Sequence, residues 1–184
     1  MATLAAATAL ALVFAVSAVL KARTTDEFAL FVASLRDYGL RSFRVRRVIA
    51  AGAITAEAAA ALILAVPVST LVRRVMVVVS LLLVLTLVNI IRAALGGEKR
   101  ACHCFGSKDT APLWLHITGN CVLLTLGAIG VLGIGAGTAT PGDALFGAGL
   151  GLILGAAVVG SGFLYASLAP AQLAVAEASP RAKL

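Results

Sequence analysis

Apolar residues in this chain come in long runs rather than in the short alternations typical of soluble helices and strands. Five runs of 19 to 25 residues cover approximately 2–20, 48–66, 75–95, 112–134 and 144–168. A helix of about 20 apolar residues spans the roughly 30 Å hydrocarbon core of a bilayer, and a helix satisfies its own backbone hydrogen bonds there. The pattern predicts an all-α integral membrane helical bundle, with 1–168 as a single transmembrane domain and 169–184 as a disordered tail.

The first run, 2–20, is N-terminal and rich in alanine, which is also typical of a cleaved signal peptide. Signal peptides carry a basic segment before their apolar core, and no Lys or Arg precedes this one. We therefore expect the run to be a membrane span.

A second kind of periodicity lies between the first two runs. Apolar residues recur there at helical spacing, at Phe28, Phe31, Val32 and Leu35. Two acidic residues precede them, and Gly39 stands where a helix would stop. This segment predicts a short interfacial amphipathic helix. A small helix packed on the other loops is the alternative.

Composition and charge agree with a membrane protein. Hydrophobic residues make up 61% of the 184 residues, and 15 Lys and Arg against 8 Asp and Glu give a net charge of +7. The basic residues flank the apolar runs, so the charge indicates a lipid bilayer as partner and no nucleic acid.

The distribution of Lys and Arg predicts an orientation. If the five runs alternate in direction, thirteen of the 15 basic residues fall on one side and only Arg73 and Arg74 on the other. By the positive-inside rule the thirteen face the cytoplasm of a multi-pass protein of the plasma membrane. The N-terminus is then outside, and the 96–112 loop is cytoplasmic.

Polar residues inside the runs are few and are candidates for function. Glu57 lies near the middle of the second run, where a charge costs about 2.5–3.5 kcal/mol. The other four form two same-face pairs at helical spacing: Asn89 with Arg92, and His116 with Asn120. Hydrogen bonding between helices is the alternative role for each, including a protonated Glu57.

Several of these residues lie at a similar estimated depth in the membrane. At about 1.5 Å per residue, Glu57, Asn89, Asn120 and Cys121 lie roughly 9–14 Å from the helix ends nearest the 96–112 loop. We therefore expect them to share one layer of the membrane, with Arg92 and His116 between that layer and the loop.

The 96–112 loop carries the strongest chemical signal. Cys102 and Cys104 flank His103 in a cationic setting that favours the reactive thiolate. Cys121 in the fourth run is a candidate resolving thiol or a small buried apolar residue. Cys102, His103 and Cys104 are also soft-metal ligands for Cu, Hg or Zn, so a metal-binding or transport protein is the main alternative. A structural staple in a membrane subunit is a third interpretation.

The string from Cys102 to Gly106, set between apolar spans and followed by Trp114 and Asn120, resembles the Cys-x-Cys-Phe-Gly signature of the MauE branch of the DoxX-like membrane proteins. The amphipathic segment and the Glu57 run are also similar, so the likeness covers most of 1–135. Two features depart from the family pattern. The fifth run, 144–168, is additional to the usual four-helix core, and Gly119 stands where a basic residue is expected.

The resemblance implies a four-helix membrane core that handles thiol and disulfide electrons beside a thioredoxin-like partner. It makes Cys102 and Cys104 the redox pair and Glu57, Asn89, Arg92 and Asn120 supporting residues. Related methylamine-utilisation proteins are linked to maturation of a disulfide-rich dehydrogenase subunit, and more distant relatives to thiosulfate or quinone oxidation.

These observations together predict a membrane thiol–disulfide oxidoreductase. Electrons would pass from Cys102 and Cys104 to Cys121, to a quinone or to another carrier, within a larger membrane complex or alone. One conflict remains at this stage, because disulfide formation is normally extracytoplasmic whereas the charge count makes the loop cytoplasmic. A cytoplasmic loop fits exchange with a reduced cytosolic carrier.

Overall fold

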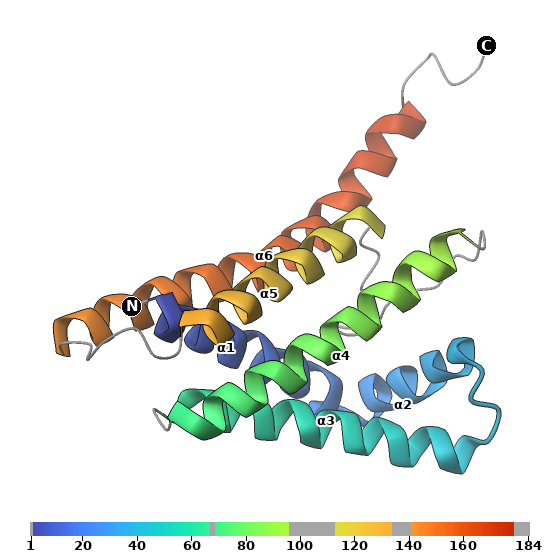
Figure 1. Ribbon diagram of the computed structural model, residues 1–184. Helices are drawn as coiled ribbons and strands as arrows, with labels where there is room; N and C mark the ends of the chain where they lie inside the picture. The colour runs from blue at the N-terminus through green and yellow to red at the C-terminus, as the bar shows by residue number, and fades with distance from the viewer. Residues whose placement is uncertain (1, 67–68, 96–112, 134–140, 179–184) are drawn as a thin grey trace.

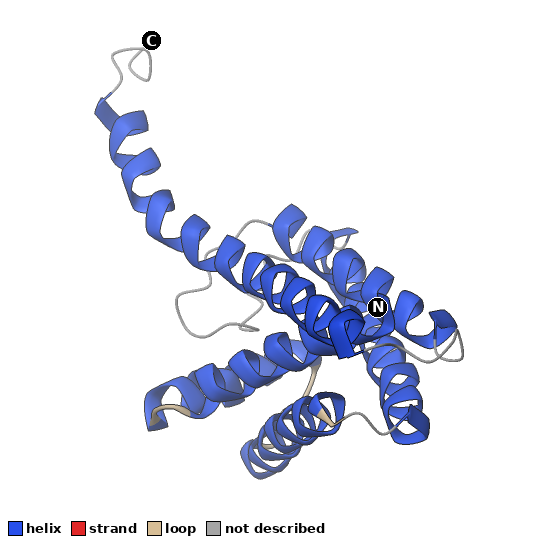
Figure 2. Ribbon diagram, turned by 90° about the vertical axis from the view of Figure 1, so that its left-hand side faces the viewer, coloured by secondary structure: helices blue, strands red, loops and turns tan. Residues whose placement is uncertain are grey.

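The structure, a computed structural model, describes residues 2–66, 69–95, 113–133 and 141–178 (Figure 1). Within these ranges the chain forms helices joined by short segments, and Figure 2 shows no strand among them. The helices are α1 (Ala2–Ala22), α2 (Thr25–Ser34), the 3-10 helix η1 (Leu35–Tyr38), α3 (Phe43–Ala65), α4 (Ser69–Leu95), α5 (Leu113–Gly133) and α6 (Pro141–Ala178). The predicted all-α membrane bundle is confirmed.

Among the described residues, four helices contain stretches long and apolar enough to cross a membrane. These stretches are Ala2–Ala22, Phe43–Ala65, Leu71–Val88 and Pro141–Ser161. Helix α5, Leu113–Gly133, coincides with the predicted run 112–134. The large apolar side chains that α3, α4 and α6 leave exposed, such as Leu62, Leu81 and Ile153, fit a lipid environment.

Successive long helices run in alternating directions. In Figure 1 the N-terminus and the first residues of α4 and α6 lie at one end of the molecule. Helix α2, the last residues of α4 and the first of α5 lie at the other, which we call the α2 end. Arg73 and Arg74, near the start of α4, are therefore far from Arg36 of η1 and from the arginines of early α3.

Helix α1 is the central helix and packs against α3, α5 and α6. Leu10 of α1 and Met76 of α4 are fully buried, and residues of α3 and α5 complete the core around them. An N-terminal helix that contacts three others is an integral part of this fold.

The contact between α1 and α6 depends on small residues. A Cβ atom at Gly151 would collide with the carbonyl oxygen of Ala5, and one at Gly155 would lie 3.0 Å from the carbonyl oxygen of Ala9. The two glycines are four residues apart, on one face of α6, and let the backbones approach as small-xxx-small patterns do.

The predicted amphipathic segment forms two elements. Helix α2 begins after Thr24, whose side chain accepts a hydrogen bond from the Glu27 amide, and η1 ends at Gly39 with φ of 83°. Gly39 is therefore the predicted stop, in a left-handed conformation that glycine favours. Val32 of α2 is buried, and the helix packs against α1 and α3.

At the C-terminus the structure differs from the sequence expectation. Helix α6 continues to Ala178, so it includes the first ten residues of the segment 169–184 that is expected to be a disordered tail. Residues 171–178 are mostly Ala, Leu, Gln and Glu, which have high helix propensity, so the helix continues although the hydropathy falls.

Candidate functional site

A polar cluster lies between α1 and α3, near the α2 end. Residues Ala6, Leu10 and Val13 of α1 form a buried stripe at helical spacing, and Ser17 and Lys21 continue it. The stripe thus changes from apolar to polar over the last two turns of α1. Opposite these turns, α3 presents Glu57.

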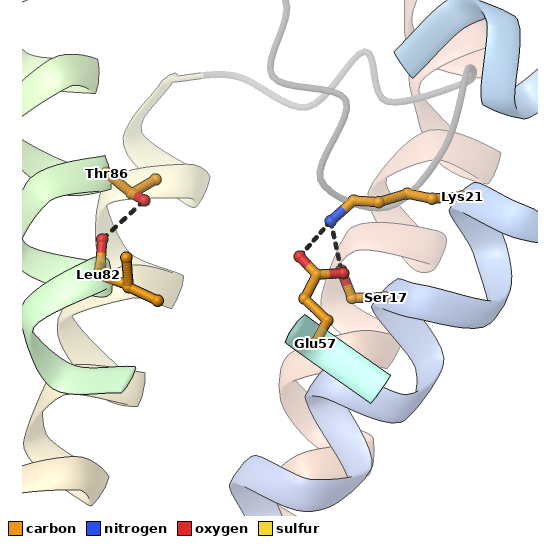
Figure 3. Close-up of polar contacts among 5 residues, drawn as sticks. All are labelled: Ser17, Lys21, Glu57, Leu82 and Thr86. Atoms are coloured by element: carbon orange, nitrogen blue, oxygen red, sulfur yellow. Dashed lines mark hydrogen bonds and ion pairs between the residues drawn. The ribbon is translucent and has the colours of Figure 1, made fainter. Parts of the chain in front are cut away.

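Three side chains in this cluster bond one another (Figure 3). Lys21 Nζ lies 2.5 Å from Glu57 Oε1 and 2.9 Å from Ser17 Oγ. Ser17 Oγ donates to Glu57 Oε2 at 3.1 Å. Both carboxylate oxygens therefore accept hydrogen bonds from α1.

The cluster is largely shielded from the surroundings. The side chain of Lys21 is 5% exposed and that of Glu57 is 20% exposed. An isolated charge at this depth would be costly, whereas an ion pair that is also hydrogen-bonded carries no net charge. Pairing explains how an apolar helix such as α3 accommodates a carboxylate.

Helix α2 closes the cluster from a third side. The ammonium group of Lys21 lies 5.0 Å from the centre of the Phe31 ring, within cation–π range. At the start of α2, Arg23 pairs with Glu27 at 2.9 Å across one helical turn. The capping by Thr24 and this ion pair together fix where α2 begins, and so place Phe31 over Lys21.

Threonines elsewhere bond within their own helices. Thr86 of α4, also drawn in Figure 3, donates to the carbonyl of Leu82 at 2.9 Å, and Thr55 of α3 donates to that of Ala51. Such bonds satisfy the hydroxyl locally. These two hydrogen bonds therefore do not connect one helix to another.

The chain matches one known protein family. Residues 1–133 match the family model described as methylamine utilisation protein MauE, which is more than two thirds of the chain. The chain belongs to the MauE family. No curated protein and no solved structure matches it significantly. The matched segment spans α1 to α5, so it includes Ser17, Lys21 and Glu57, while α6 lies outside it.

Among the predicted functional residues of this MauE-family chain whose side chains the structure describes, Glu57 lies in the polar cluster. Arg92, on α4, is exposed, and Asn120, on α5, is half-buried. Asn89 lies on α4 and His116 on α5, but their side chains are outside the described part. Whether these residues share one layer stays a prediction.

The structure describes one of the three cysteines. Cys121 of α5 is a free, exposed thiol on the helix surface. Cys102, His103 and Cys104 fall in 96–112, outside the described residues. Within the described ranges no three His, Cys, Asp or Glu side chains come together as a metal site would require.

Sequence reasoning missed Ser17 and Lys21. Lys21 is counted only among the basic residues that flank the apolar runs, and Ser17 is not singled out. Their spacing carried a signal, because residues 10, 13, 17 and 21 fall on one face of a helix. A polar continuation of a buried stripe predicts a polar partner on the facing helix.

Proposed function

We propose that this protein transfers reducing equivalents by thiol–disulfide exchange at Cys102 and Cys104. The observation that carries the proposal is the Cys102–Gly106 string in a chain of the MauE family, within the matched segment 1–133. The string connects α4 to α5.

The residues around the two cysteines support this chemistry. Lys99, Arg100 and Lys108 provide positive charge close in sequence, and positive charge favours the thiolate that acts as nucleophile. Phe105-Gly106 follows directly, and glycine gives the chain the freedom that a Cys-x-Cys ring requires.

The exchange proceeds in two displacements. A thiolate from one cysteine attacks a disulfide of a thioredoxin-like partner, which forms a mixed disulfide and releases one partner thiolate. The second cysteine then attacks the mixed disulfide as thiolate and releases the other partner thiolate. The partner gains two electrons and takes up two protons, and Cys102 and Cys104 become a disulfide.

A second carrier must restore the pair to its starting state. A reduced dithiol carrier or a reduced quinone would supply the two electrons. Cys121 would take part as a thiolate that attacks the Cys102–Cys104 disulfide and releases one of these cysteines, and the carrier would then reduce the new disulfide between Cys121 and the other. In the reverse direction, the same steps oxidise the partner and support disulfide formation in a maturing protein. Glu57, Asn89, Arg92, His103, His116 and Asn120 are the proposed supporting polar residues.

We also propose that the α2 end faces the cytoplasm. Lys21 and Arg23 and the arginines from Arg36 to Arg47 lie at that end, and Arg73 and Arg74 lie near the opposite one. A reporter fused at the C-terminus should give the cytoplasmic signal and one at 67–68 the extracytoplasmic signal; the reverse assignment would contradict this orientation.

The deciding experiment is cysteine mapping in the full-length protein. Purified protein is equilibrated across thiol redox buffers, alkylated differentially before and after reduction, and analysed by mass spectrometry with metal content measured in parallel. We expect a reversible disulfide that involves Cys102 or Cys104, and capture of a thioredoxin-like protein by Cys104→Ser. Cys121→Ser is the matched control, which should retain the Cys102–Cys104 disulfide.

Two results would contradict the proposal. Cysteines that remain reduced in every buffer and hold a stoichiometric metal ion would indicate a soft-metal protein. Full transfer activity in the Cys102→Ser and Cys104→Ser variants would remove both residues from the reaction.

A further inference from the structure

An open groove lies at the α2 end, outside the cluster of Lys21 and Glu57. Its volume is about 370 Å³, within the roughly 300–1,000 Å³ range of small-molecule sites. The lining residues come from the end of α1, the start of α2 and one face of α3: Ala22, Thr24, Thr25, Phe28, Ala51, Ile54 and Thr55. The walls are thus mainly apolar and contain no charged side chain.

Two arginines precede the groove on α3, between its lining residues and the helix start. Arg47 is one turn before Ala51, and Arg44 is three residues before Arg47, so both share the face of Ala51 and Thr55. At about 1.5 Å per residue they are roughly 6 and 10 Å from Ala51 along the axis. Both are exposed, and neither makes an ion pair with any residue that the structure describes.

In the other direction along α3 the same face becomes a lipid-facing surface. Thr55, Ala59 and Leu62 follow at helical spacing, and all three are exposed. Leu62 is 71% exposed, although it is large and apolar. Along this face of α3, the arginines come first, the groove at Ala51 and Thr55 follows, and the apolar residues Ala59 and Leu62 come last, within the membrane span.

This sequence of surfaces matches an amphiphile with a negative head and an apolar chain. We propose that the groove and the α3 face bind one anionic phospholipid, with its phosphate at Arg44 and Arg47 and an acyl chain along Ala51, Thr55 and Leu62. Charge complementarity selects the headgroup, because arginines beside a membrane span attract anionic lipids by about 1 kcal/mol each.

The acidic residues near the groove define where the phosphate lies. Asp26 is exposed and follows Thr25, whereas Glu27 is paired with Arg23. The Asp26 carboxylate on α2 repels a phosphate, so the headgroup lies over α3 rather than over α2. Asp26→Asn should therefore strengthen binding of the anionic lipid about two- to threefold.

The test is native mass spectrometry of the full-length protein in a neutral detergent. Delipidated protein is titrated with palmitoyl-oleoyl-phosphatidylglycerol and, separately, with phosphatidylcholine of the same chains. We expect one phosphatidylglycerol to bind more tightly than phosphatidylcholine. Arg44→Gln with Arg47→Gln should lower its affinity about thirtyfold, which corresponds to two arginines at about 1 kcal/mol each.

The opposite end of the molecule provides a matched control. Arg73→Gln with Arg74→Gln removes the same two charges from early α4 and should leave phosphatidylglycerol affinity within about twofold. Ala51→Phe fills the groove without a change of charge and should weaken both lipids. Thermal unfolding in detergent alone verifies that each variant is folded, so a loss of lipid is not a loss of structure.

Three outcomes would overturn the proposal. Equal affinity for the two lipids would show that charge does not select the ligand. An equal loss in the Arg73 and Arg74 variant would indicate general attraction to a basic protein. Competition by inorganic phosphate at the concentration of the lipid would identify an anion site that needs no acyl chain.

Discussion

On the side that faces α6, helix α1 brings backbone carbonyls and the side chains of Thr8 and Leu12 close to glycines, whereas on the side that faces α3 it offers an ammonium group and a hydroxyl. The α6 contact brings Gly151 against the carbonyl of Ala5. The α3 contact joins Lys21 and Ser17 to Glu57. Helix α1 therefore packs closely against α6 at one interface and forms hydrogen bonds and an ion pair with α3 at the other.

The difference shows two ways to hold helices together where water is absent. Apolar side chains gain little by leaving lipid for another helix, so association depends on close packing or on polar contacts. Close packing constrains distance but tolerates sliding by a turn when small residues repeat. A hydrogen-bonded ion pair constrains the axial position of the two helices, because its geometry is met at a single register.

The two interfaces also differ in their relation to the family. The polar one lies within the segment that matches MauE, and the close-packed one joins α1 to a helix outside it. A helix that docks by shape alone can be added to a bundle without a new polar partner in the membrane. This explains how α6 extends the family fold while the contacts of α3 stay complete.

The largest effect should follow removal of one partner of the ion pair. Glu57→Ala leaves Lys21 buried without a carboxylate, and we expect a loss of about 3 kcal/mol in the free energy of unfolding. This is the lower end for buried pairs, because Lys21 is the penultimate residue of α1 and can extend toward the interface. Reversible unfolding by sodium dodecyl sulfate measures the change.

The control for this prediction replaces both charges. Lys21→Met with Glu57→Leu exchanges the pair for apolar side chains of similar volume and should recover most of the lost stability. If the double variant is as unstable as Glu57→Ala, the ion pair stabilises the fold by more than the free-energy cost of burying its two charges.

The next effect concerns the close-packed interface. Gly151→Leu forces α1 and α6 apart, because the obstacle is the Ala5 backbone and cannot rotate away, and we expect a loss of about 1–3 kcal/mol. Gly149→Leu is the matched control, since a Cβ there meets nothing within 4 Å. Similar losses for both variants would show that helix propensity, rather than the contact, determines the result.

Much of this fold could be predicted from the sequence. Hydropathy alone identifies the long helices because a bilayer restricts spanning segments to one regular structure. Gly39 and the acidic residues before Phe28 are local signals, and local signals determine where α2 and η1 begin and end. The extension of α6 to Ala178 was missed because hydropathy reports the membrane boundary and not the helix end.

The candidate site was predicted less completely. Glu57 stands out in any apolar run, but its partner depends on how α1 crosses α3, which no local pattern encodes. Lys21 is at a helix end, where a lysine is expected to reach the interface. Its burial follows from the packing of α2 over it, a tertiary contact through Phe31.

A smaller effect is expected from the hydroxyl of the cluster. Ser17→Ala removes the hydrogen bond to Glu57 Oε2 and the one accepted from Lys21, each worth about 0.6 kcal/mol in a membrane protein, so the loss should be about 1 kcal/mol. Detergent unfolding again measures it. The loss should disappear in the Lys21→Met, Glu57→Leu background, and its persistence there would assign it to packing of α1.

The smallest effect should come from the aromatic ring above the ammonium group. Phe31→Leu keeps an apolar side chain but removes the cation–π contact, and we expect about 0.5 kcal/mol because Lys21 Nζ is already bonded to a carboxylate. A double-mutant cycle with Lys21→Met separates this contact from lost packing of the ring. In the Glu57→Ala background the same substitution should cost more, since the ring and Ser17 Oγ are then the remaining partners of a buried charge. An effect that is equal in all three backgrounds would mean that Phe31 contributes packing alone, and that the polar face of α1 is held by α3 without help from α2.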